Sequence, residues 1–315
     1  MTNLGRVGVL LGGRSSEREV SLLSGRAVLE ALRSRAIDAH PFDPYLQPLS
    51  ELERAGFDRV FIALHGRFGE DGTVQGVLET LRIPYTGSGV QASAVAIDKL
   101  VTKRLWVWAG IPTPPWRELQ PGVDYDAVLA ELGGAVMVKP RSEGSTIGIS
   151  KVTSNAGGEL AQAAAQALRY DTRVFAEQLI TGRELTCSIL GSGGQAHALP
   201  LIEIRAPQGN YDYQNKYFKD DTQYLCPAPI DPALEQRIQQ VCLQAYAVVG
   251  ARGWGRIDVM LKPDPQGDQP VLLELNTSPG MTGHSLVPIA ARACGIDFAD
   301  LVVRILSEAA LESPA

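Results

Sequence analysis

The sequence predicts a mixed fold, in which an N-terminal parallel α/β layer precedes two α+β lobes. Strand-like and helix-like segments alternate over residues 6–97, which is the pattern of a parallel sheet. The alternation stops at 98–115, where a helical segment ends in glycine and prolines typical of a linker. A hairpin pattern follows near the C-terminal end. We therefore expect three units, residues 1–97, 98–183 and 184–315.

The composition limits the classes of function. The chain has 315 residues, and 45% of them are apolar, which is enough for more than one hydrophobic core. The net charge is −6 with acidic and basic residues interleaved, so there is no basic stripe for nucleic acid or anionic lipid. No apolar run has membrane-spanning length, and no signal-like segment begins the chain. We expect a cytoplasmic protein that binds small molecules, without nucleic-acid or membrane partners.

The first unit contains predicted strands at 7–11 and 59–64 and predicted helices at 17–34 and 72–81. The turn after the first strand has paired glycines but lacks the G-x-G-x-x-G pattern, so a dinucleotide site is weakly supported. Both strands end at one edge of the predicted sheet, where polar side chains can meet a ligand.

Glu17 and His65 follow these two strands. A carboxylate at the carboxyl edge of a sheet can receive an ammonium group, which favours a functional role for Glu17. The structural alternative is that Ser16 and Glu19 form a capping box while Glu17 is stabilised by the helix dipole. A single histidine is more often structural than functional, and the residues alone favour that interpretation for His65.

The second unit has predicted strands at 135–140 and 173–177 and a predicted helix at 156–168. The glycine-rich run 139–148 begins with Lys139 at the end of the first of these strands. Glycines and small hydroxyl residues let backbone N–H groups approach an anion, and the lysine adds a positive charge. The run is therefore a candidate phosphate-binding loop. It lacks the G-x-x-x-x-G-K pattern, and an ordinary hairpin is an equal alternative.

The third unit begins with strands from Glu184, followed by an aromatic loop at 211–224, a helix at 232–249 and a closing helix from Asp297. The loop holds four of the nine tyrosines, which indicates a lid over a substrate; an Ω-loop packed on itself is the alternative. The four cysteines are far apart and lack C-x-x-C spacing. We expect them to pack as small apolar side chains.

The hairpin consists of two runs, 256–260 and 273–280, in which apolar and polar residues alternate with the period of a strand. Turn residues at 263–268 separate the runs. One side of the hairpin should face a core. The residues on that side are Ile257, Val259, Leu273 and Leu275.

The other side of the hairpin carries polar residues. Antiparallel pairing brings Asp258 opposite Glu274, with Asn276 and Arg256 as neighbours on the same face. Two carboxylates and an amide oxygen suit Mg²⁺, and the guanidinium offers a positive fork for an anion beside the metal. The structural alternative is an edge hairpin with a solvated face.

Several short motifs are spread in order along nearly the whole chain. They are Glu17-Arg18-Glu19-Val20-Ser21, Ala63-Leu64-His65-Gly66, Tyr85-Thr86-Gly87-Ser88-Gly89, the glycine-rich run, Tyr213 to Tyr217, Gly255-Arg256-Ile257-Asp258, and Glu274 to Ser285. Together they resemble the D-alanine–D-alanine ligase family of the ATP-grasp superfamily. Two positions depart from the family pattern: Leu275 stands where alanine or valine is common, and Gln178 stands where lysine is frequent.

The resemblance implies a two-lobed ATP-grasp fold after residue 97 and an ATP-dependent ligase. In this family ATP phosphorylates the carboxylate of one D-alanine, and the amine of a second attacks the acyl phosphate. The products are D-alanyl-D-alanine for peptidoglycan precursors, ADP and phosphate. The resemblance also implies two Mg²⁺ ions, which Mn²⁺ can replace, and a homodimer.

The resemblance also implies roles for individual residues. The metal ligands would be Asp258, Glu274 and Asn276. ATP would be bound by Lys99, Lys139, Ser145, Glu177, Glu184 and Lys216. The first D-alanine would be bound by Glu17 and His65, and the second by Lys216 and Ser285. The remaining catalytic residues would be Ser145 and Tyr217, which link Glu17 to the lid, and Arg256 with the Gly280 N–H, which form the oxyanion site.

Three other functions stay open. Another ATP-grasp ligase would keep the hairpin and the phosphate loop but need not keep Glu17, Ser145 and Tyr217. A nicotinamide-dependent oxidoreductase would explain the first strand and turn but leaves Asp258 and Glu274 without a role. A non-catalytic nucleotide-binding regulator would not need the complete set of charged positions.

Overall fold

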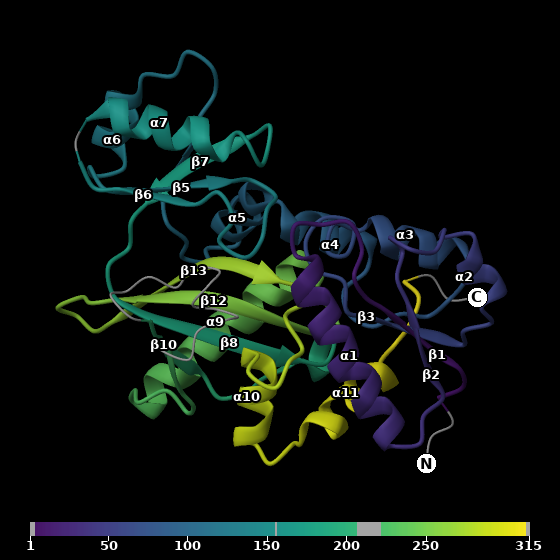
Figure 1. The fold of residues 1–315 in the computed structure, drawn as a ribbon. Helices are drawn as coiled ribbons and strands as arrows, with labels where there is room; N and C mark the ends of the chain where they lie inside the picture. The colour runs from purple at the N-terminus through teal and green to yellow at the C-terminus, as the bar shows by residue number, and fades with distance from the viewer. Residues whose placement is uncertain (1–3, 155, 207–221, 313–315) are drawn as a thin grey trace.

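The structure is a computed structural model that describes residues 4–154, 156–206 and 222–312. Figure 1 shows three bodies: the N-terminal layer at the right, a long twisted sheet at the centre left, and a smaller lobe that stands above this sheet. Helix α5 (Lys99–Trp108) lies where the upper lobe meets the rest of the molecule. The predicted order, a parallel α/β layer followed by two α+β lobes, is confirmed.

The N-terminal layer contains a parallel sheet with the strand order β2-β1-β3. Its strands are β1 (Val7–Leu10), β2 (Ala39–Phe42) and β3 (Arg59–Ile62). Helix α1 (Arg18–Ser34) packs on one face, and α2 (Glu51–Arg54) and α3 (Thr73–Thr80) pack on the other. Strand β2 was not predicted from the sequence, because Pro41 and the polar His40 interrupt its apolar pattern.

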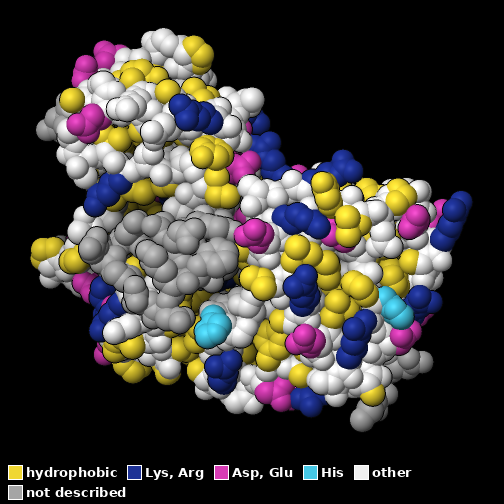
Figure 2. Space-filling model, in the orientation of Figure 1, with side chains coloured by type: hydrophobic (Ala, Val, Ile, Leu, Met, Phe, Trp, Pro, Cys, Tyr) yellow, Lys and Arg dark blue, Asp and Glu magenta, His cyan; other side chains and the backbone are white. Residues whose placement is uncertain are grey.

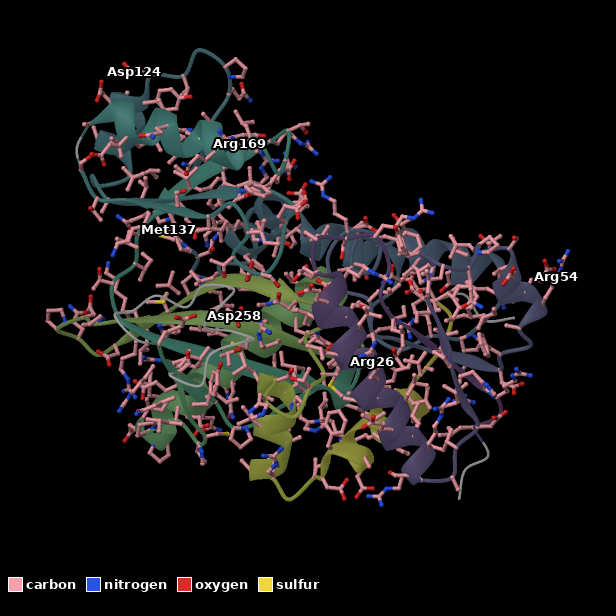
Figure 3. The ribbon with its side chains drawn as sticks, viewed as in Figure 1. Arg26, Arg54, Asp124, Met137, Arg169 and Asp258 are labelled. Carbon is pink, nitrogen blue, oxygen red and sulfur yellow. The ribbon has the colours of Figure 1, made fainter. Side chains whose placement is uncertain are left out.

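The central lobe has an antiparallel sheet with the order β4-β7-β5-β6. Its elements are β4 (Trp116–Glu118), α6 (Tyr125–Glu131), β5 (Val136–Pro140), β6 (Ser150–Val152), α7 (Gly157–Ala167) and β7 (Val174–Gln178). Val136 and Val138 join the core beneath α6 and α7. Because strand residues alternate between faces, Met137 and Lys139 lie on the opposite face. Figure 3 shows Met137 between this sheet and the sheet that carries Asp258.

The C-terminal lobe has an antiparallel sheet with the order β11-β10-β8-β12-β13, and β9 pairs with β8. The strands are β8 (Arg183–Leu190), β9 (His197–Ala198), β10 (Ile202–Arg205), β11 (Gln223–Leu225), β12 (Trp254–Lys262) and β13 (Gln269–Asn276). The other helices of the described residues are α4 (Val90–Ile97), the 3-10 helix η1 (Gly193–Gln195), α9 (Pro232–Val249), α10 (Leu286–Ala293) and α11 (Phe298–Ser307). α9 covers the apolar face of the sheet, and α11 packs against α1.

The hairpin of β12 and β13 has the predicted register, with Asp258 opposite Glu274 and Arg256 opposite Asn276. One detail of the prediction is wrong. A β-bulge between Asp258 and Val259 shifts the pairing, so Leu272, rather than Leu273, is the buried partner in the core. Leu273 is half-buried.

The prediction for the cysteines is wrong at one position. Cys187 and Cys242 are buried, and Cys226 packs against the edge of a core. Cys294 is exposed, because it is the residue at which α10 ends and the chain turns at Gly295. All four are free thiols.

The surface agrees with the even charge distribution expected from the sequence. Figure 2 shows blue and magenta side chains interspersed over one face, with no large patch of a single charge. Among the helices of the described residues, none is both long enough and apolar enough to cross a membrane.

Helix α9 offers a test of how local sequence stabilises this fold. The Asp231 carboxylate accepts hydrogen bonds from the backbone N–H groups of Ala233 and Leu234, at 2.8 and 3.3 Å. We expect Asp231→Ala to lower the free energy of unfolding by about 1 kcal/mol, because these N–H groups lose their acceptor. Denaturant unfolding measures the change. Asp231→Asn is the control and should stay close to wild type; equal losses in both variants would contradict the capping role.

Candidate active site

The polar face of the β12–β13 hairpin forms a hydrogen-bonded cluster centred on Asp258. Arg256 binds both carboxylate oxygens of Asp258, through Nε and Nη2, at 2.8 Å each. Asn276 Nδ2 donates to Oδ2 at 3.2 Å. Thr186, which lies opposite Asp258 on β8, donates from its hydroxyl to Oδ1 at 2.9 Å. The Asp258 carboxylate is thus bound by side chains from β8, β12 and β13.

Lys99 connects this hairpin to the central lobe. Its Nζ lies 3.2 Å from Glu274 Oε2 and donates to the Glu143 carbonyl oxygen at 2.6 Å. Lys99 is the first residue of α5, and the Asp98 carboxylate caps that helix. Arg141 donates to the same Asp98 carboxylate at 2.6 Å, which ties the start of α5 to the end of β5.

Glu177, on β7, pairs with two lysines. Its Oε1 lies 2.5 Å from Lys139 Nζ, and its Oε2 lies 2.9 Å from Lys103 Nζ. Burial alone would raise the pKa of Glu177, but the two ammonium charges hold it below its usual value. Although burial opposes it, the charges of Glu177, Glu274 and Asp258 raise the pKa of Lys139. The polar faces of the two sheets therefore act on each other electrostatically.

The glycine-rich loop after β5 reaches the N-terminal layer. The Ser145 hydroxyl donates a hydrogen bond to Glu17 Oε1. Ser145 and Thr146 have left-handed backbone conformations, with φ of 51° and 64°. Two glycines allow this approach, because a Cβ at Gly144 or Gly66 would lie 2.8 or 2.6 Å from Glu17 Oε2. The Glu17 carboxylate would have to move if either glycine were replaced.

Glu17 stands at the start of α1, and the structure does not have the capping box that was the structural alternative for this segment. Glu17 is itself the N-cap residue and makes no side-chain cap hydrogen bond, and the Ser16 hydroxyl points toward Glu143. Burial, followed by the charge of Glu70, raises the pKa of Glu17, while Ser145, His65 and Lys99 lower it to a smaller extent. A buried carboxylate without a structural cap is suited to receive a cationic group.

His65 lies behind Glu17, three residues after β3 ends. One ring nitrogen is 2.9 Å from the Ser278 carbonyl oxygen, and the other is 2.9 Å from the Ser24 hydroxyl. Glu70 Oε1 lies 3.6 Å from His65 Nδ1. The imidazole thus links the N-terminal layer to the segment after β13, which agrees with the structural interpretation from the residues.

Other candidates lie at the margins of this cluster. Glu184 is the second residue of β8, and Gly280 follows β13. Ser285 is the N-cap of α10, and its hydroxyl oxygen accepts a hydrogen bond from the Thr282 N–H. Lys216 and Tyr217, with most of the predicted lid, lie outside the described residues.

Three residues that contact the cluster were not predicted from the sequence. Thr186 contacts Asp258, Lys103 contacts Glu177, and Arg67 contacts Glu143, with Nε and Oε1 2.6 Å apart. Lys103 follows Lys99 by one helical turn, so the helical period could have predicted that both face one side. Nothing in the sequence pairs Thr186 with Asp258 or Arg67 with Glu143, because the two residues of each pair are 72 and 76 positions apart in the chain.

The oxygen atoms of the hairpin are suitable for a hard divalent cation. Asp258, Glu274 and Asn276 supply carboxylate and amide oxygens from adjacent strand positions, which is the donor type that Mg²⁺ prefers. In this structure Arg256 and Lys99 provide the positive charge beside the two carboxylates. Among the described residues, no group of three or more His, Cys, Asp or Glu forms an alternative metal site.

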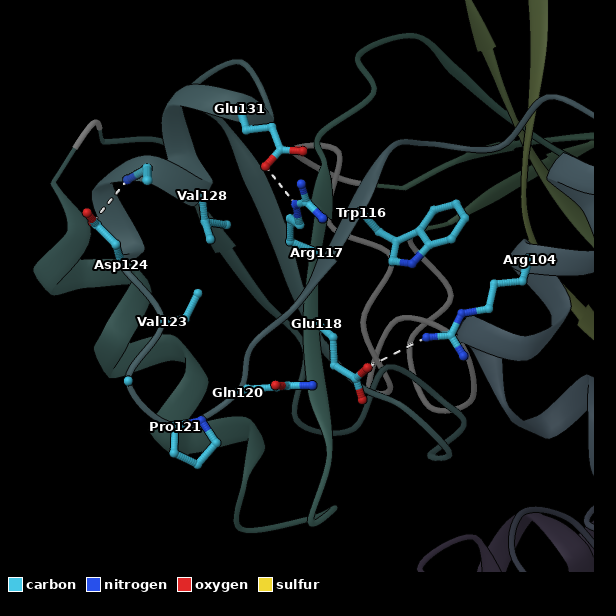
Figure 4. A pocket seen from close by; sticks show the side chains of 12 residues that line it. Arg104, Trp116, Arg117, Glu118, Gln120, Pro121, Val123, Asp124, Val128 and Glu131 are labelled. Carbon is cyan, nitrogen blue, oxygen red and sulfur yellow. Dashed lines mark hydrogen bonds and ion pairs between the residues drawn. The ribbon is translucent and has the colours of Figure 1, made fainter.

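A separate pocket of about 650 Å³ lies on the central lobe. Figure 4 shows it between β4, α6 and Arg104 of α5, with Trp116 at one side. Four of its charged side chains pair with each other, Arg117 with Glu131 and Arg104 with Glu118, and Asp124 caps α6. None of the predicted site residues lines it, so it is distinct from the cluster described above.

Comparisons with known proteins give one consistent result. The family model described as "D-ala D-ala ligase C-terminus" matches residues 105–307, and "D-ala D-ala ligase N-terminus" matches 44–88. The D-alanine–D-alanine ligase of Cupriavidus metallidurans is 59% identical over 310 residues, covering 98% of this chain and 93% of the relative. That of Bordetella avium is 58% identical over 313 residues, covering 99% and 97%.

Solved structures agree. The D-alanine–D-alanine ligase of Bacillus anthracis complexed with ATP is 33% identical, with a TM-score of 0.81 and coverage of 96% of both chains. The VanG D-Ala:D-Ser ligase of Enterococcus faecalis is 29% identical, with a TM-score of 0.80 and coverage of 96% of this chain and 98% of that one. By sequence and by structure, this chain belongs to the D-alanine–D-alanine ligase family.

Proposed function

We propose that this chain joins two D-alanine molecules in an ATP-dependent reaction for peptidoglycan precursor synthesis. ATP phosphorylates the first carboxylate, and the second amine displaces phosphate from the acyl phosphate to give D-alanyl-D-alanine, ADP and phosphate. One observation carries the proposal. The glycine-rich loop contacts Glu17 through Ser145 and Lys99 through the Glu143 carbonyl, and Lys99 contacts Glu274. These contacts support the proposal because they connect the carboxylate that would bind the ammonium group, the loop that would bind phosphate and the hairpin that would hold the metal.

The nucleotide would lie between the two polar sheet faces. Lys99 and Lys139 would neutralise its phosphates, Glu177 and Glu184 would bind its base and ribose, and Ser145 and Lys216 would complete the contacts. Asp258, Glu274 and Asn276 would hold two Mg²⁺ ions, or Mn²⁺ in their place. The metal, when bound, would neutralise the charge that develops on the transferred phosphoryl group.

The two amino acids would be held separately. Glu17 would receive the ammonium group of the first D-alanine, with support from His65, and Ser145 and Tyr217 would position Glu17. Ser285 and Lys216 would bind the carboxylate of the second.

The oxyanion of the tetrahedral intermediate would form beside Arg256 and the Gly280 N–H. Arg256 already lies on the polar face of β12, with its guanidinium fixed by Asp258. A donor that is oriented before the reaction stabilises the developing charge without reorganisation.

We further propose three domains, residues 1–97, 98–183 and 184–315. Each contains one of the three sheets. We infer a homodimer from the family resemblance, and light scattering would test it. We infer the cytoplasm as the location because the reaction consumes ATP.

The direct test is phosphate release with ATP, Mg²⁺ and D-alanine, with the product identified by mass. We expect D-alanine-dependent phosphate and an equal amount of dipeptide. L-alanine and the omission of amino acid are controls, and D-serine tests the second-substrate position. Phosphate without dipeptide would direct the search to other amines, and the absence of turnover in folded, ATP-bound protein would contradict the proposal.

Arg256 provides a test of the oxyanion role. We expect Arg256→Ala to lower kcat by roughly 100- to 1,000-fold while the affinity for ATP changes little, because the charge it stabilises develops only during the reaction. Phosphate release measures kcat, and calorimetry without D-alanine measures ATP binding. The matched control is Arg237→Ala on the exposed side of α9. A large loss of ATP affinity with unchanged kcat would refute this role.

Glu17 should govern the acid side of the pH profile. It binds an ammonium group only when ionised, and burial and Glu70 raise its pKa. Activity should therefore be lost on acidification at a pH above the usual range for glutamate. Glu70→Gln should move this loss to lower pH, because Glu70 raises the pKa of Glu17 more than His65 lowers it. The measurement is kcat/KM for D-alanine against pH, with Glu53→Gln as control; an unmoved profile in Glu70→Gln would argue against Glu17.

A further inference from the structure

Lys103 is a buried charged residue that the proposed reaction does not use. It lies on α5, one turn after Lys99, and its side chain is 1% exposed. Its Nζ is 2.9 Å from Glu177 Oε2 and donates to the Thr113 hydroxyl oxygen at 2.7 Å. Thr113 in turn donates to the Leu272 carbonyl oxygen at 2.8 Å. The ammonium group is thus fixed between α5, the central sheet and β13.

Lys103 and Lys139 together place two positive charges on one carboxylate. Each oxygen of Glu177 has its own ammonium partner, and the side chains of Glu177 and Lys139 are 2% and 10% exposed. The other carboxylates whose charges act on these lysines are Glu274, on both, and Asp258, on Lys139. Glu274 pairs with Lys99 at 3.2 Å, and Asp258 pairs with Arg256 at 2.8 Å. A buried excess of positive charge is costly unless an anion offsets it, and nucleotide phosphates would supply that anion.

The two lysines differ in how they are held. Lys139 lies at the end of β5 where the glycine-rich loop begins, on the face toward the C-terminal sheet. Lys103 is anchored by Thr113 and points from a helix into the lobe junction. If the Lys139 ammonium group pairs with a phosphate of the nucleotide, Glu177 loses one of its two ion-pair partners. Lys103 stays on the other oxygen.

We propose that Lys103 is a positioning residue, the fixed counter-charge that keeps Glu177 ionised and in place when Lys139 turns to the nucleotide. The proposal rests on the proposed function, in which Lys139 and Glu177 both contact ATP. It adds that the affinity for nucleotide depends on a lysine that does not touch the nucleotide.

Removing Lys103 should change the number of protons that the protein takes up when nucleotide binds. Without Lys103, Glu177 has only Lys139 as a partner. Nucleotide binding then either leaves a buried carboxylate uncompensated or converts it to the carboxylic acid by uptake of one proton from the buffer. The second outcome is detectable, because the number of protons bound with the ligand changes.

The experiment is calorimetry of Mg²⁺–ADP binding at pH 8 in two buffers with different ionisation enthalpies. ADP avoids turnover, and its phosphates are ionised at this pH. We expect Lys103→Met to take up about one more proton per ADP than wild type and to bind ADP about tenfold more weakly. Lys103→Arg keeps the positive charge, so the number of protons that it takes up per ADP should be close to that of wild type. Thr113→Val removes a hydrogen-bond partner without removing charge, and should bind ADP with the wild-type number of protons.

Two results would overturn the proposal. One is a folded Lys103→Met variant that binds ADP with the same affinity and the same proton uptake as wild type. This result would mean that Lys103 only contributes to packing. The other is equal extra proton uptake in Thr113→Val. If Lys103→Met does not fold, Lys103→Gln gives the same comparison with a polar neutral side chain. Failure of wild type to bind ADP would instead contradict the proposed function, so the two failures are distinguishable.

Discussion

The structure depends on the mutual neutralisation of charges between two polar sheet faces. The C-terminal sheet presents Asp258 and Glu274, and the central sheet presents Lys139 beside Glu177. Buried charges are tolerated only when they are paired. Every carboxylate in this group has a cation within about 3 Å, and these cations come from β5, β12 and α5. The same charges that join the lobes are those that a nucleotide with its metal would reorganise.

Helix α5 positions two of the cations, Lys99 and Lys103, that pair with these carboxylates. Its capping residue Asp98 is also bound by Arg141, so the helix start is fixed to the strand that leads into the glycine-rich loop. Lys99 and Lys103, one turn apart, then point to Glu274 and Glu177. A short helix therefore sets the spacing between the β12–β13 hairpin and the central sheet.

The site also requires the backbone of two segments to lie close to the Glu17 carboxylate. The loop at Ser145 can contact Glu17 only because Gly144 and Gly66 leave no Cβ beside that carboxylate. The motifs that contain Glu17, Gly66 and Gly144 are far apart in the sequence, but their atoms pack closely together in the structure. This accounts for Gly144, whose backbone is not left-handed, whereas Gly66 also needs glycine for its left-handed φ of 68°.

Local pattern determined much of this protein. Strand alternation predicted the register that sets Asp258 opposite Glu274, and the alternation of elements predicted the parallel layer, because both depend on near neighbours in the sequence. Tertiary structure alone decided the bulge that buries Leu272, the exposure of Cys294 and the absence of a capping box at Ser16. It also decided the pairing of Lys103 with Glu177 and of Ser145 with Glu17. These depend on contacts between residues remote in sequence, whose free energy is set by burial and by charges that no local pattern contains.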